Sequence, residues 1–546
     1  MMSAINYRNR SVSSHDFSMI PRASIPRSAF KMERAYKTTF DAGYLIPFHC
    51  QEVLPGDSFS VNAACFARMA TPLYPIMDNL HLDTFWFFVP NRLIWDNWQK
   101  FQGEQENPGD SISFTIPQQV SPTNGYALNS LQDYFGLPTT GTPAITAAVS
   151  HSALPLRAYN LIYNQWFRDE NLQNSVVVNK GDGPDNIADY VLLRRGKRHD
   201  YFTSCLPWPQ KGGTSVSLPL GTSAPVKGIG MFGATSAVTA GTTVRQSDGA
   251  SSVLPYSVSG ADTGTVNALR FAVKTNSTTA YPDIYADLSA ATAATINQIR
   301  QAFQIQRLLE RDARGGTRYT EILRSHFGVV SPDARLQRPE YLGGSSVPVQ
   351  THAVAQTSAA GVTGSSTPLA QLGAVAQVVA HTGFSQSFVE HGYIIGLCSV
   401  RADLTYQQGL ERHWSRLTRY DFYMPVFAML GEQAVLNKEI YCTGGAADSQ
   451  VFGYQERWAE YRYLPSKITG LFRSTASGTL DGWHLSQEFA SLPSLNSTFI
   501  QENPPLDRVL AVSSQVGKQF LCDIFIKIKA ARPLPMYSVP GLIDHL

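Results

Sequence analysis

The sequence predicts a mainly β fold with long loops, and three observations support this class. The 546-residue chain holds 41 Gly and 32 Pro, which mark many turns. A hydrophobic fraction of 43%, with 24 Tyr and 28 Phe, is typical of a folded protein with a large core. Two segments near opposite ends of the chain alternate apolar and polar residues with the period of a strand. A chain of this length holds one or two domains.

The two alternating segments lie at residues 57–67 and 520–529. In DSFSVNAACFA the apolar and polar side chains take opposite faces: Phe59, Val61, Ala63 and Cys65 against Ser58, Ser60 and Asn62. Near the C-terminus the same pattern sets Phe520, Cys522, Ile524, Ile526 and Ile528 against Asp523, Lys527 and Lys529. A sheet that takes strands from both ends of the chain is typical of a Greek-key sandwich.

The most aromatic segment is DTFWFFVPNRLIWDNWQKF at residues 83–101. A membrane span needs roughly 18 consecutive apolar residues, and Asn91 and Arg92 interrupt this run. A ligand cage would need converging polar groups, which the segment lacks. We predict a strand at 80–89 that is apolar on both faces at its end, and after Pro90 a helix that packs through Ile94, Trp98 and Phe101.

Two further helices are predicted. LPLRAYNLIYNQWF has Pro155 at an early helical position, and its apolar stripe is formed by Tyr159, Ile162 or Tyr163, and Trp166. The other begins at a capping-box spacing of Thr295 and Gln298, ends at Gly315 and Gly316, and carries a stripe of Ile296, Ile299 and Phe303. Helices therefore interrupt a mainly β protein.

Two segments concentrate positive charge. Residues 1–40 carry seven basic residues against two acidic ones, and Pro21 and Pro26 prevent a long helix, so an extended basic arm is expected, with a disordered solvated tail as the alternative. RRGKR at residues 194–198 is followed by Tyr201, Phe202 and Trp208, a mixture that single-stranded nucleic-acid binders use. Its alternative is a solvated charged corner or a salt-bridge partner between subunits.

Residues 213–290 change composition to Gly, Ser, Thr, Ala and Val with few charges. A loop of this length is expected to be functional or to build its own small structure, so we predict a surface insertion that associates with copies of itself; a mobile loop is the alternative. The tail contains Pro533, Pro535 and Pro540 and is expected to be extended. The N-terminus shows no apolar signal-peptide segment.

Signs of chemistry are few. The common nucleophile, zinc-protease, phosphate-loop and dinucleotide motifs do not occur, so no enzyme and no cofactor are expected. GDGPDNIAD gathers Asp182, Asp185 and Asp189 but misses the EF-hand spacing, so a polar turn is favoured over a cation site. His199 and Cys205 alone do not make a zinc site. The six cysteines form no C-x-x-C pair and are expected to be buried free thiols.

Several long segments resemble a known family. HDFSMIPRASIPRSAF, FHCQEVLPGDSF, MDNLHLDTFWFFVPNRLIWDNWQKFQGE, PLRAYNLIYNQWFRDENLQ, DYFTSCLPWPQKG, RYTEILRSHFGVVSPDARLQRPEYLGG and GLCSVRADLTYQQGLERHWSR follow in order across nearly the whole chain. Together they are similar to the major capsid proteins of microviruses, in the gokushovirus branch. The match is weakest over residues 213–290.

The resemblance implies an eight-stranded antiparallel viral jelly-roll with large loop insertions and a few helices. Its parts would be a basic arm at 1–40, a core at 41–212 and 291–530, a threefold protrusion at 213–290, and an extended arm at 531–546. Sixty copies would form a T=1 icosahedral shell around a circular single-stranded DNA genome. The implied location is the virion, assembled in the cytoplasm of a bacterial host. Implied partners are a small basic DNA-packaging protein, a minor pilot protein and a host surface receptor.

Charge adds an expectation of its own. The net charge is +2, and sixty copies at about +120 fall far short of the phosphates of a genome, so a separate basic packaging protein or trapped cations are expected. The candidate nucleic-acid contacts are Arg8, Arg10, Arg22, Arg27, Arg194, Arg195, Lys197, Arg198, Tyr201 and Trp208. A carbohydrate-binding surface protein and an enzyme with carboxylates from distant strands stay open as other classes.

Overall fold

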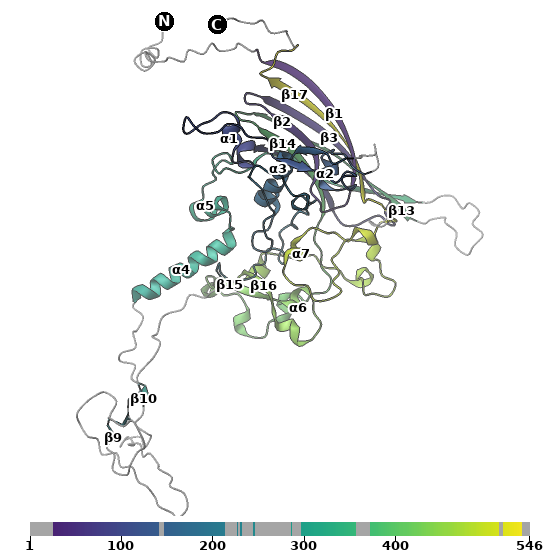
Figure 1. Ribbon diagram of the computed structural model, residues 1–546. Coiled ribbons are helices and arrows are strands. Elements are labelled where there is room, and N and C mark those ends of the chain that lie inside the picture. Colours follow the sequence, from purple (N-terminus) through teal and green to yellow (C-terminus); the bar gives the residue numbers. More distant parts are fainter. Residues whose placement is uncertain are drawn as a thin grey trace, which may run out of the picture. The chain divides into compact units, whose positions relative to one another are not determined.

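The computed structural model describes most of the chain. The described residues are 26–140, 147–212, 296–355, 372–512 and 517–537, with short strands at 226–227, 230–231, 244–245 and 285–286. They fall into two compact units, one formed by residues up to 209 and from 314 onward, the other by residues 210–313. The larger unit contains a sandwich of two antiparallel sheets, so the mainly β prediction is confirmed (Figure 1).

The strand order of this sandwich is that of a jelly roll. One sheet runs β1-β17-β3-β13-β12 and the other β11-β4-β14-β2. Successive strands of the sandwich alternate between the two sheets, with two exceptions. β4 is followed by β11, its neighbour in the same sheet, and β12 is an extra strand at the edge of the other sheet. The bounds are β1 Ser28–Phe40, β2 Ile46–Val53, β3 Ser58–Met69, β4 Leu80–Pro90, β11 Glu340–Pro348, β12 Gln350–Ala355, β13 Leu372–Ser387, β14 Gly392–Ala402 and β17 Phe520–Arg532.

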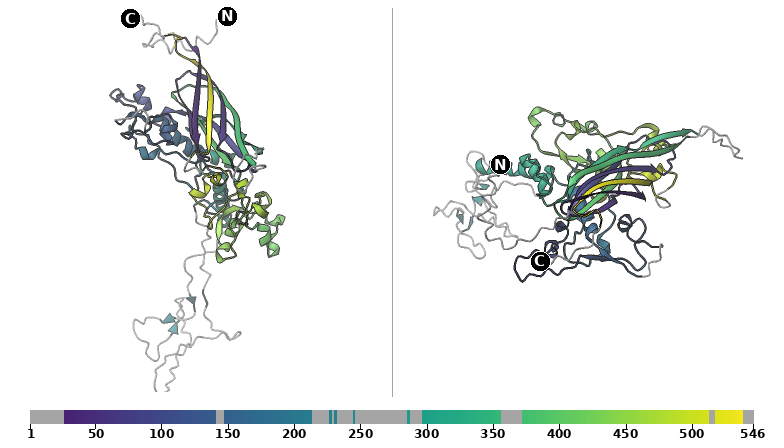
Figure 2. Two further views of the ribbon diagram at one scale, coloured as in Figure 1. Left: turned by 90° about the vertical axis from the view of Figure 1, so that its right-hand side faces the viewer. Right: turned by 90° about the horizontal axis from the view of Figure 1, so that it is seen from above.

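Both alternating segments are strands of the five-stranded sheet, as predicted. β17 pairs with β1 on one side and with β3 on the other, so the C-terminal strand lies between two N-terminal ones (Figure 2). Their apolar faces point between the sheets and form the main core with residues of β2, β4 and β14. Trp86 of β4 ties the sheets together, because its indole Nε1 donates a 3.0 Å hydrogen bond to Thr382 Oγ1 of β13.

The four-stranded sheet is covered on its other face as well. Phe87 and Val89 of β4 point away from the sandwich core and join a second cluster with Ile395 and Leu397 of β14. The covering segment is formed by residues 91–140 and 147–193, and its side chains Trp95 and Tyr159 are fully buried there. The prediction that β4 is apolar on both faces is thereby confirmed, because each face meets a different core. The blue segment lies along this side of the strands in Figure 2.

The helices of this covering segment are short. The predicted helix after Pro90 is instead a 3-10 turn at Asn91–Leu93 followed by the single turn α1, Trp98–Phe101, because Asp96 and Asn97 separate the two. The predicted helix at Pro155 is α3, Leu154–Ile162, extended by a π turn at Tyr163–Phe167. The remaining elements are α2 Leu131–Tyr134, β5 Gln118–Val120 and β6 Ser150–Ser152.

Residues 403–519 connect β14 to β17 and contain few regular elements. A third apolar cluster holds them, with Tyr201, Phe202, Val435 and Phe452 among its members. The elements are β15 Glu432–Leu436, α6 Asn437–Ile440, β16 Val451–Glu456 and α7 Ser497–Ile500, and α5 Tyr319–Phe327 precedes β11. These loops are therefore anchored by apolar packing where secondary structure is sparse.

The smaller unit contains the helix predicted at Ile296. It is α4, Ile296–Gly315, followed by Gly316 at φ +99°, and its stripe residues Ile296 and Phe303 are exposed. Within the predicted insertion at 213–290 the structure describes two strand pairs, β7 Val226–Lys227 with β10 Tyr285–Ala286, and β8 Gly230–Met231 with β9 Val244–Arg245. The rest of the insertion, and Thr295 of the predicted capping box, lie outside the described residues.

Both predicted arms begin or end inside the sandwich. Residues 28–40 of the expected N-terminal arm form β1, because its inward side chains, Met32 and Tyr36 among them, pack against the core. Residues 531–532 of the expected C-terminal arm are the last of β17. Residues 1–25 and 538–546 lie outside the described part. Among the described helices, none has the length and apolar character that crossing a membrane requires.

Candidate nucleic-acid and subunit interfaces

The RRGKR segment at residues 194–198 is held between two parts of the backbone. Arg195 N donates to Gly43 O at 2.9 Å, while Arg195 O accepts from Glu502 N at 2.9 Å and Lys197 N donates to Ile500 O at 2.7 Å. Gly43 has φ +84°, and a Cβ there would lie 2.1 Å from Glu502 O. Only glycine fits this close approach, so the segment is fixed against the start of β2 and the loop before β17.

Arg194 and Arg195 are engaged with groups of the same chain. Arg194 Nη1 donates to Ala42 O at 3.2 Å and Glu502 O at 2.9 Å, and its guanidinium carbon lies 4.0 Å from the centre of the Tyr44 ring. Arg195 Nη1 lies 2.5 Å from Asp83 Oδ2. Both guanidinium groups are therefore engaged within the fold, although Arg195 Nε is buried without a hydrogen-bond partner among the described residues.

Asp83 of β4 is shared by two arginines. Arg401 Nε of β14 lies 2.8 Å from the same Oδ2 atom that Arg195 contacts. Burial alone would raise the pKa of the Asp83 carboxyl, but the charge of Arg195 and the hydrogen bonds from Ser346, Arg401 and Arg195 hold that pKa below its ordinary value. Asp83 therefore stays ionised and anchors the segment to the four-stranded sheet.

Lys197 is buried against Phe499, with its ammonium nitrogen 4.6 Å from the ring centre. Burial lowers the pKa of this lysine, and burial raises the pKa of the nearby Glu502. Tyr201 is also buried and donates a 2.7 Å hydrogen bond to Glu439 Oε2. These side chains serve the interior of the subunit. They form neither a solvated charged corner nor a salt-bridge partner between subunits, the two alternatives left open above, because their contacts are buried within one chain.

The remaining candidate residues divide between surface and undescribed segments. Arg198 has 63% of its side chain exposed and lies 3.4 Å from Asp403 Oδ1. Trp208 is half-buried. Arg27 Nη2 donates to Ser58 Oγ at 2.9 Å, next to the first residue of β1. Arg8, Arg10 and Arg22 lie outside the described residues.

GDGPDNIAD forms the predicted polar turn. Its Asp185 makes a buried double ion pair with Arg157 of α3, and Asp182 Oδ1 accepts from Trp95 Nε1 at 2.7 Å and from Asn97 Nδ2 at 2.9 Å. Two of its three carboxylates, those of Asp182 and Asp185, are thus bound by side chains of the chain itself. Of the cysteines, 65, 205, 398 and 522 are buried free thiols, as predicted, whereas Cys50 is partly buried and Cys442 is exposed.

An exposed apolar surface covers residues 414–430, and we call it the apolar loop surface. Leu417 and Met429 have exposed fractions of 93% and 92%, and the other large exposed side chains are Trp414, Tyr420, Phe422, Tyr423, Val426 and Leu430. A contiguous run of this kind on a soluble protein marks a site of protein association. Sequence reasoning missed it, because loops without periodicity give no face from which exposure can be predicted.

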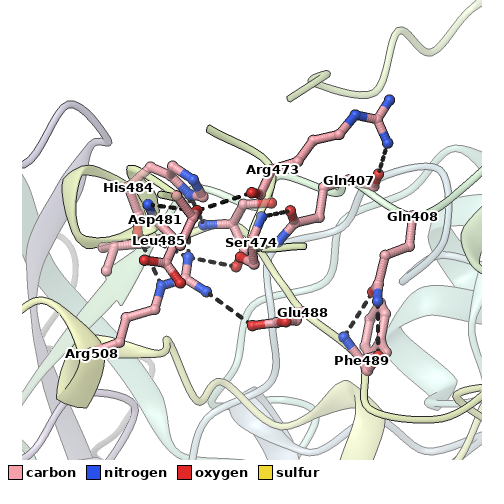
Figure 3. Close-up of polar contacts among 12 residues, drawn as sticks. Gln407, Gln408, Arg473, Ser474, Asp481, His484, Leu485, Glu488, Phe489 and Arg508 are labelled. Atoms are coloured by element: carbon pink, nitrogen blue, oxygen red, sulfur yellow. Dashed lines mark hydrogen bonds and ion pairs between the residues drawn. The ribbon is translucent and has the colours of Figure 1, made fainter. Parts of the chain in front are cut away.

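The loops near this surface are tied together by polar contacts. Arg473 Nη1 donates to Gln407 O at 2.9 Å, and the side chain of Gln407 exchanges two hydrogen bonds with Ser474 (Figure 3). Gln408 forms a matching pair with the backbone of Phe489, with distances of 2.8 and 2.7 Å. These contacts fix residues 407–408 to residues 473–474 and 489, and Gln407 lines the same cavity as Trp414 at the start of the apolar loop surface.

A cavity of about 500 Å³ opens beside the same loops. Its charged lining is paired, because Arg412 Nη1 lies 3.0 Å from Glu439 Oε1 and Arg416 Nη2 lies 3.5 Å from Glu460 Oε1. Burial raises the pKa of Glu439, an effect that Arg412 opposes. The lining offers no unpaired acid and base at reaction distance, and we assign it no chemistry.

The sequence of the whole chain matches one protein family. The model of that family, described as capsid protein (F protein), aligns with residues 18–542. The chain belongs to this capsid family. The capsid protein VP1 of Bdellovibrio phage phiMH2K is 46% identical over 96% of this chain and 97% of its own length, and that of Chlamydia phage 1 is 46% identical over 97% and 98%. Capsid protein VP1 of Spiroplasma virus 4 is 36% identical over 97% of each chain.

The resemblance to the gokushovirus branch of the microviruses is thereby confirmed. The chain is a structural capsid protein rather than an enzyme, it associates with itself, and it resides in the virion. The outer face of its five-stranded sheet is a second exposed surface, and sequence reasoning did not predict it.

Proposed function

We propose that this capsid protein assembles as sixty copies into a T=1 icosahedral shell that encloses a circular single-stranded DNA genome. The observation that carries the proposal is the family match over residues 18–542, which includes the sandwich and all the loops that extend it. Closed symmetric shells require self-complementary or heterologous contacts that repeat identically on every copy. A jelly roll with long loops supplies a rigid body and variable contact surfaces for this purpose.

The apolar loop surface supports assembly through subunit contacts. Leu417 and Met429 are almost fully exposed in the single chain, and covering apolar area contributes roughly 25 cal/mol per Å². Trp458 Nε1 donates a 3.1 Å hydrogen bond to Phe427 O within this surface, and such contacts reduce the conformational entropy that is lost on association. The occupant we propose for this surface is a neighbouring copy of the same chain.

We propose fewer genome-contacting residues than the sequence alone indicated. Arg8, Arg10, Arg22 and Arg27 precede or begin the first strand, and Arg198 is exposed. Arg194, Arg195, Lys197 and Tyr201 hold the fold together instead, and Trp208 stays a candidate for base stacking. Because the net charge is only +2, a small basic DNA-packaging protein remains part of the proposal.

The insertion at residues 213–290 is the proposed host-attachment surface, where sixty copies would bind a host surface receptor by avidity. We also propose that a minor pilot protein is a partner and that the shell assembles in the cytoplasm of a bacterial host. The resemblance to the microviruses supports both points.

The test is electron microscopy of native material after gradient sedimentation. Uniform icosahedral particles with knobs at the threefold positions and DNA inside are expected. A species that stays small when scaffolding and packaging partners are supplied would refute the shell, and particles of another symmetry would refute the T=1 arrangement.

A further inference from the structure

The outer face of the five-stranded sheet is exposed along β1, β17, β3 and β13. The strand register brings its side chains into rows that run across the sheet. One row contains Lys31, Lys529, Ser60 and Ser385, and the neighbouring row contains Glu33, Lys527, Asn62 and Gly383. The outer face of the four-stranded sheet is instead packed against residues 91–140 and 147–193. This face is therefore the open side of the sandwich.

Two pairs of charges on this face are balanced across the strands, whereas Lys31, Lys529 and Arg68 have no acidic residue opposite them. Lys37 forms an ion pair with Asp523, and Glu33 lies opposite Lys527. Lys31 lies directly opposite Lys529, and within the described residues neither lysine has an ion pair. Directly opposed residues have Cβ atoms about 4.5–5.5 Å apart, so two like charges there destabilise the strand pair. A bound anion would remove this repulsion.

The two lysines line a basin of about 570 Å³. Its other polar side chains are the amide of Gln386 and the hydroxyls of Ser58, Ser60, Ser385 and Ser387, and Ser58 Oγ lies 2.6 Å from Ser387 Oγ. Arg27 reaches Ser58 Oγ from the side on which the chain enters β1. Lysine ammonium groups with surrounding hydroxyls are the groups that proteins use to contact phosphates. No carboxylate is among the lining residues.

We propose that the Lys31–Lys529 basin binds the phosphodiester backbone of single-stranded DNA, and that subunits turn this sheet face toward the genome. The inference rests on the proposed function, and it adds the surface and the residues through which the shell would hold its DNA. Sixty basins would give a repeated set of weak phosphate contacts that do not depend on base sequence.

Two further features of the same face favour single-stranded DNA over a free anion. Phe525 and Phe66 are exposed on it, so bases could stack beside the basin. Phe525 lies four residues from Lys529 along β17, which is about 13 Å. Arg27, the residue before β1, reaches Ser58 of the basin and adds a third basic side chain to it. The excess of positive charge disfavours a basic protein as the occupant.

The test compares particles and free subunits of four full-length proteins. These are wild type, Lys31→Gln/Lys529→Gln, Lys31→Arg/Lys529→Arg, and the matched control Lys100→Gln/Lys180→Gln, which removes two lysines from the segment that covers the other sheet. Binding of a short labelled oligothymidylate is measured on subunits over a range of salt concentrations, and DNA content is measured in particles. The Gln pair should lower DNA content and reduce the salt slope by about 1.4, since each phosphate contact contributes about 0.7. The Arg pair and the control should keep the wild-type slope.

The proposal is overturned if the Gln pair keeps the wild-type slope, or if the control loses as much. A second possibility is that the basin binds an acidic protein, and competition with polyglutamate tests it. If the Gln pair lost polyglutamate binding but kept oligothymidylate binding, the DNA assignment would be refuted. If the Gln pair does not assemble, the subunit measurement still decides. Failure of the proposed shell would show in the wild type, as missing particles or particles without DNA, whatever the variants do.

Discussion

Arg157 of α3 and Asp185 of the following turn form a double ion pair in a site without solvent access. Arg157 Nε lies 2.7 Å from Asp185 Oδ2 and Nη2 lies 2.6 Å from Oδ1, and both side chains are fully buried. Arg157 Nη1 also donates to Ile94 O at 3.1 Å and Gly181 O at 2.9 Å. This pair joins the helix, the aromatic segment after β4 and the turn into one body.

Asp185→Asn should destabilise the subunit by about 3–5 kcal/mol, because it leaves a buried guanidinium without its counter-charge. The matched control is Glu390→Gln, which breaks the partly exposed pair with Arg92 and should cost about 1 kcal/mol or less. Thermal unfolding of purified subunits measures both. Equal losses in the two variants would contradict the role assigned to the buried pair.

The buried side chain of His49 in β2 should make the folded subunit less stable in mild acid. Burial lowers its pKa to about 4, helped by the charge of Arg34, and neither ring nitrogen has a hydrogen-bond partner in the described part of the chain. Between pH 4 and the ordinary value of about 6.5 the unfolded chain binds a proton that the folded chain does not. Stability should therefore be full above about pH 6.5 and fall by up to about 3 kcal/mol as the pH drops to 4.

The variant His49→Leu should flatten this part of the pH profile of the unfolding midpoint. His352→Leu, at an exposed position of β12, serves as the control and should leave the profile as in the wild type. A profile that stays equally steep in His49→Leu would exclude His49 as the cause.

Leu417→Ser with Met429→Ser should prevent or weaken shell assembly while the subunit stays folded. Both side chains are almost fully exposed, so the change in folding stability should stay within about 0.5 kcal/mol. Sedimentation measures assembly, and thermal unfolding measures the fold. Val389→Ser, at an exposed position between β13 and β14, is the control. Normal assembly of the double variant would remove the apolar loop surface from the subunit contacts.

Arg195→Gln should affect the stability of the fold, whereas Arg198→Gln should affect the DNA content of particles. The first breaks the ion pair with Asp83 and should lower the unfolding midpoint, whereas the second removes a largely exposed charge and should lower only the DNA content of particles. Absorbance ratios of purified particles give the DNA content. If Arg198→Gln particles carry the wild-type amount, Arg198 is not a genome contact.

Replacement of residues 220–285 by a short Gly-Ser linker should spare assembly and abolish adsorption to host cells, because the proposed attachment contacts lie on the insertion. Particle counts by electron microscopy and adsorption assays test the two parts separately. Particles that adsorb normally would refute host attachment by this segment.

The sequence predicted the fold best where side-chain periodicity was strong. β3, β17 and the doubly apolar β4 were all correctly placed, because burial on one or both faces of a strand leaves a direct pattern. The helix after Pro90 was wrong as a single element: its stripe residues are packed as expected, but the backbone passes through two separate turns. β1 was taken for an arm, because its charged outer face hid a weak inner alternation.

The candidate site was harder to predict, because a basic run has the same appearance whether its charges face solvent or buried carboxylates. Asp83 lies more than a hundred residues from the Arg195 with which it forms an ion pair, so only the fold reveals the pairing. The opposed lysines of β1 and β17 were likewise invisible, since their register joins residues 31 and 529.

The position of β17 between β1 and β3 has a consequence for biosynthesis. β1 and β3 each lack their central neighbour until the last strand has left the ribosome, and roughly 450 residues, or about 25–90 s of translation, separate the end of β3 from the start of β17. During that time β1 and β3 have apolar faces and unpaired edges, and such edges promote aggregation. A nascent capsid subunit is therefore a natural client for a ribosome-associated chaperone, and its yield should depend on elongation speed in the segment that precedes residue 520.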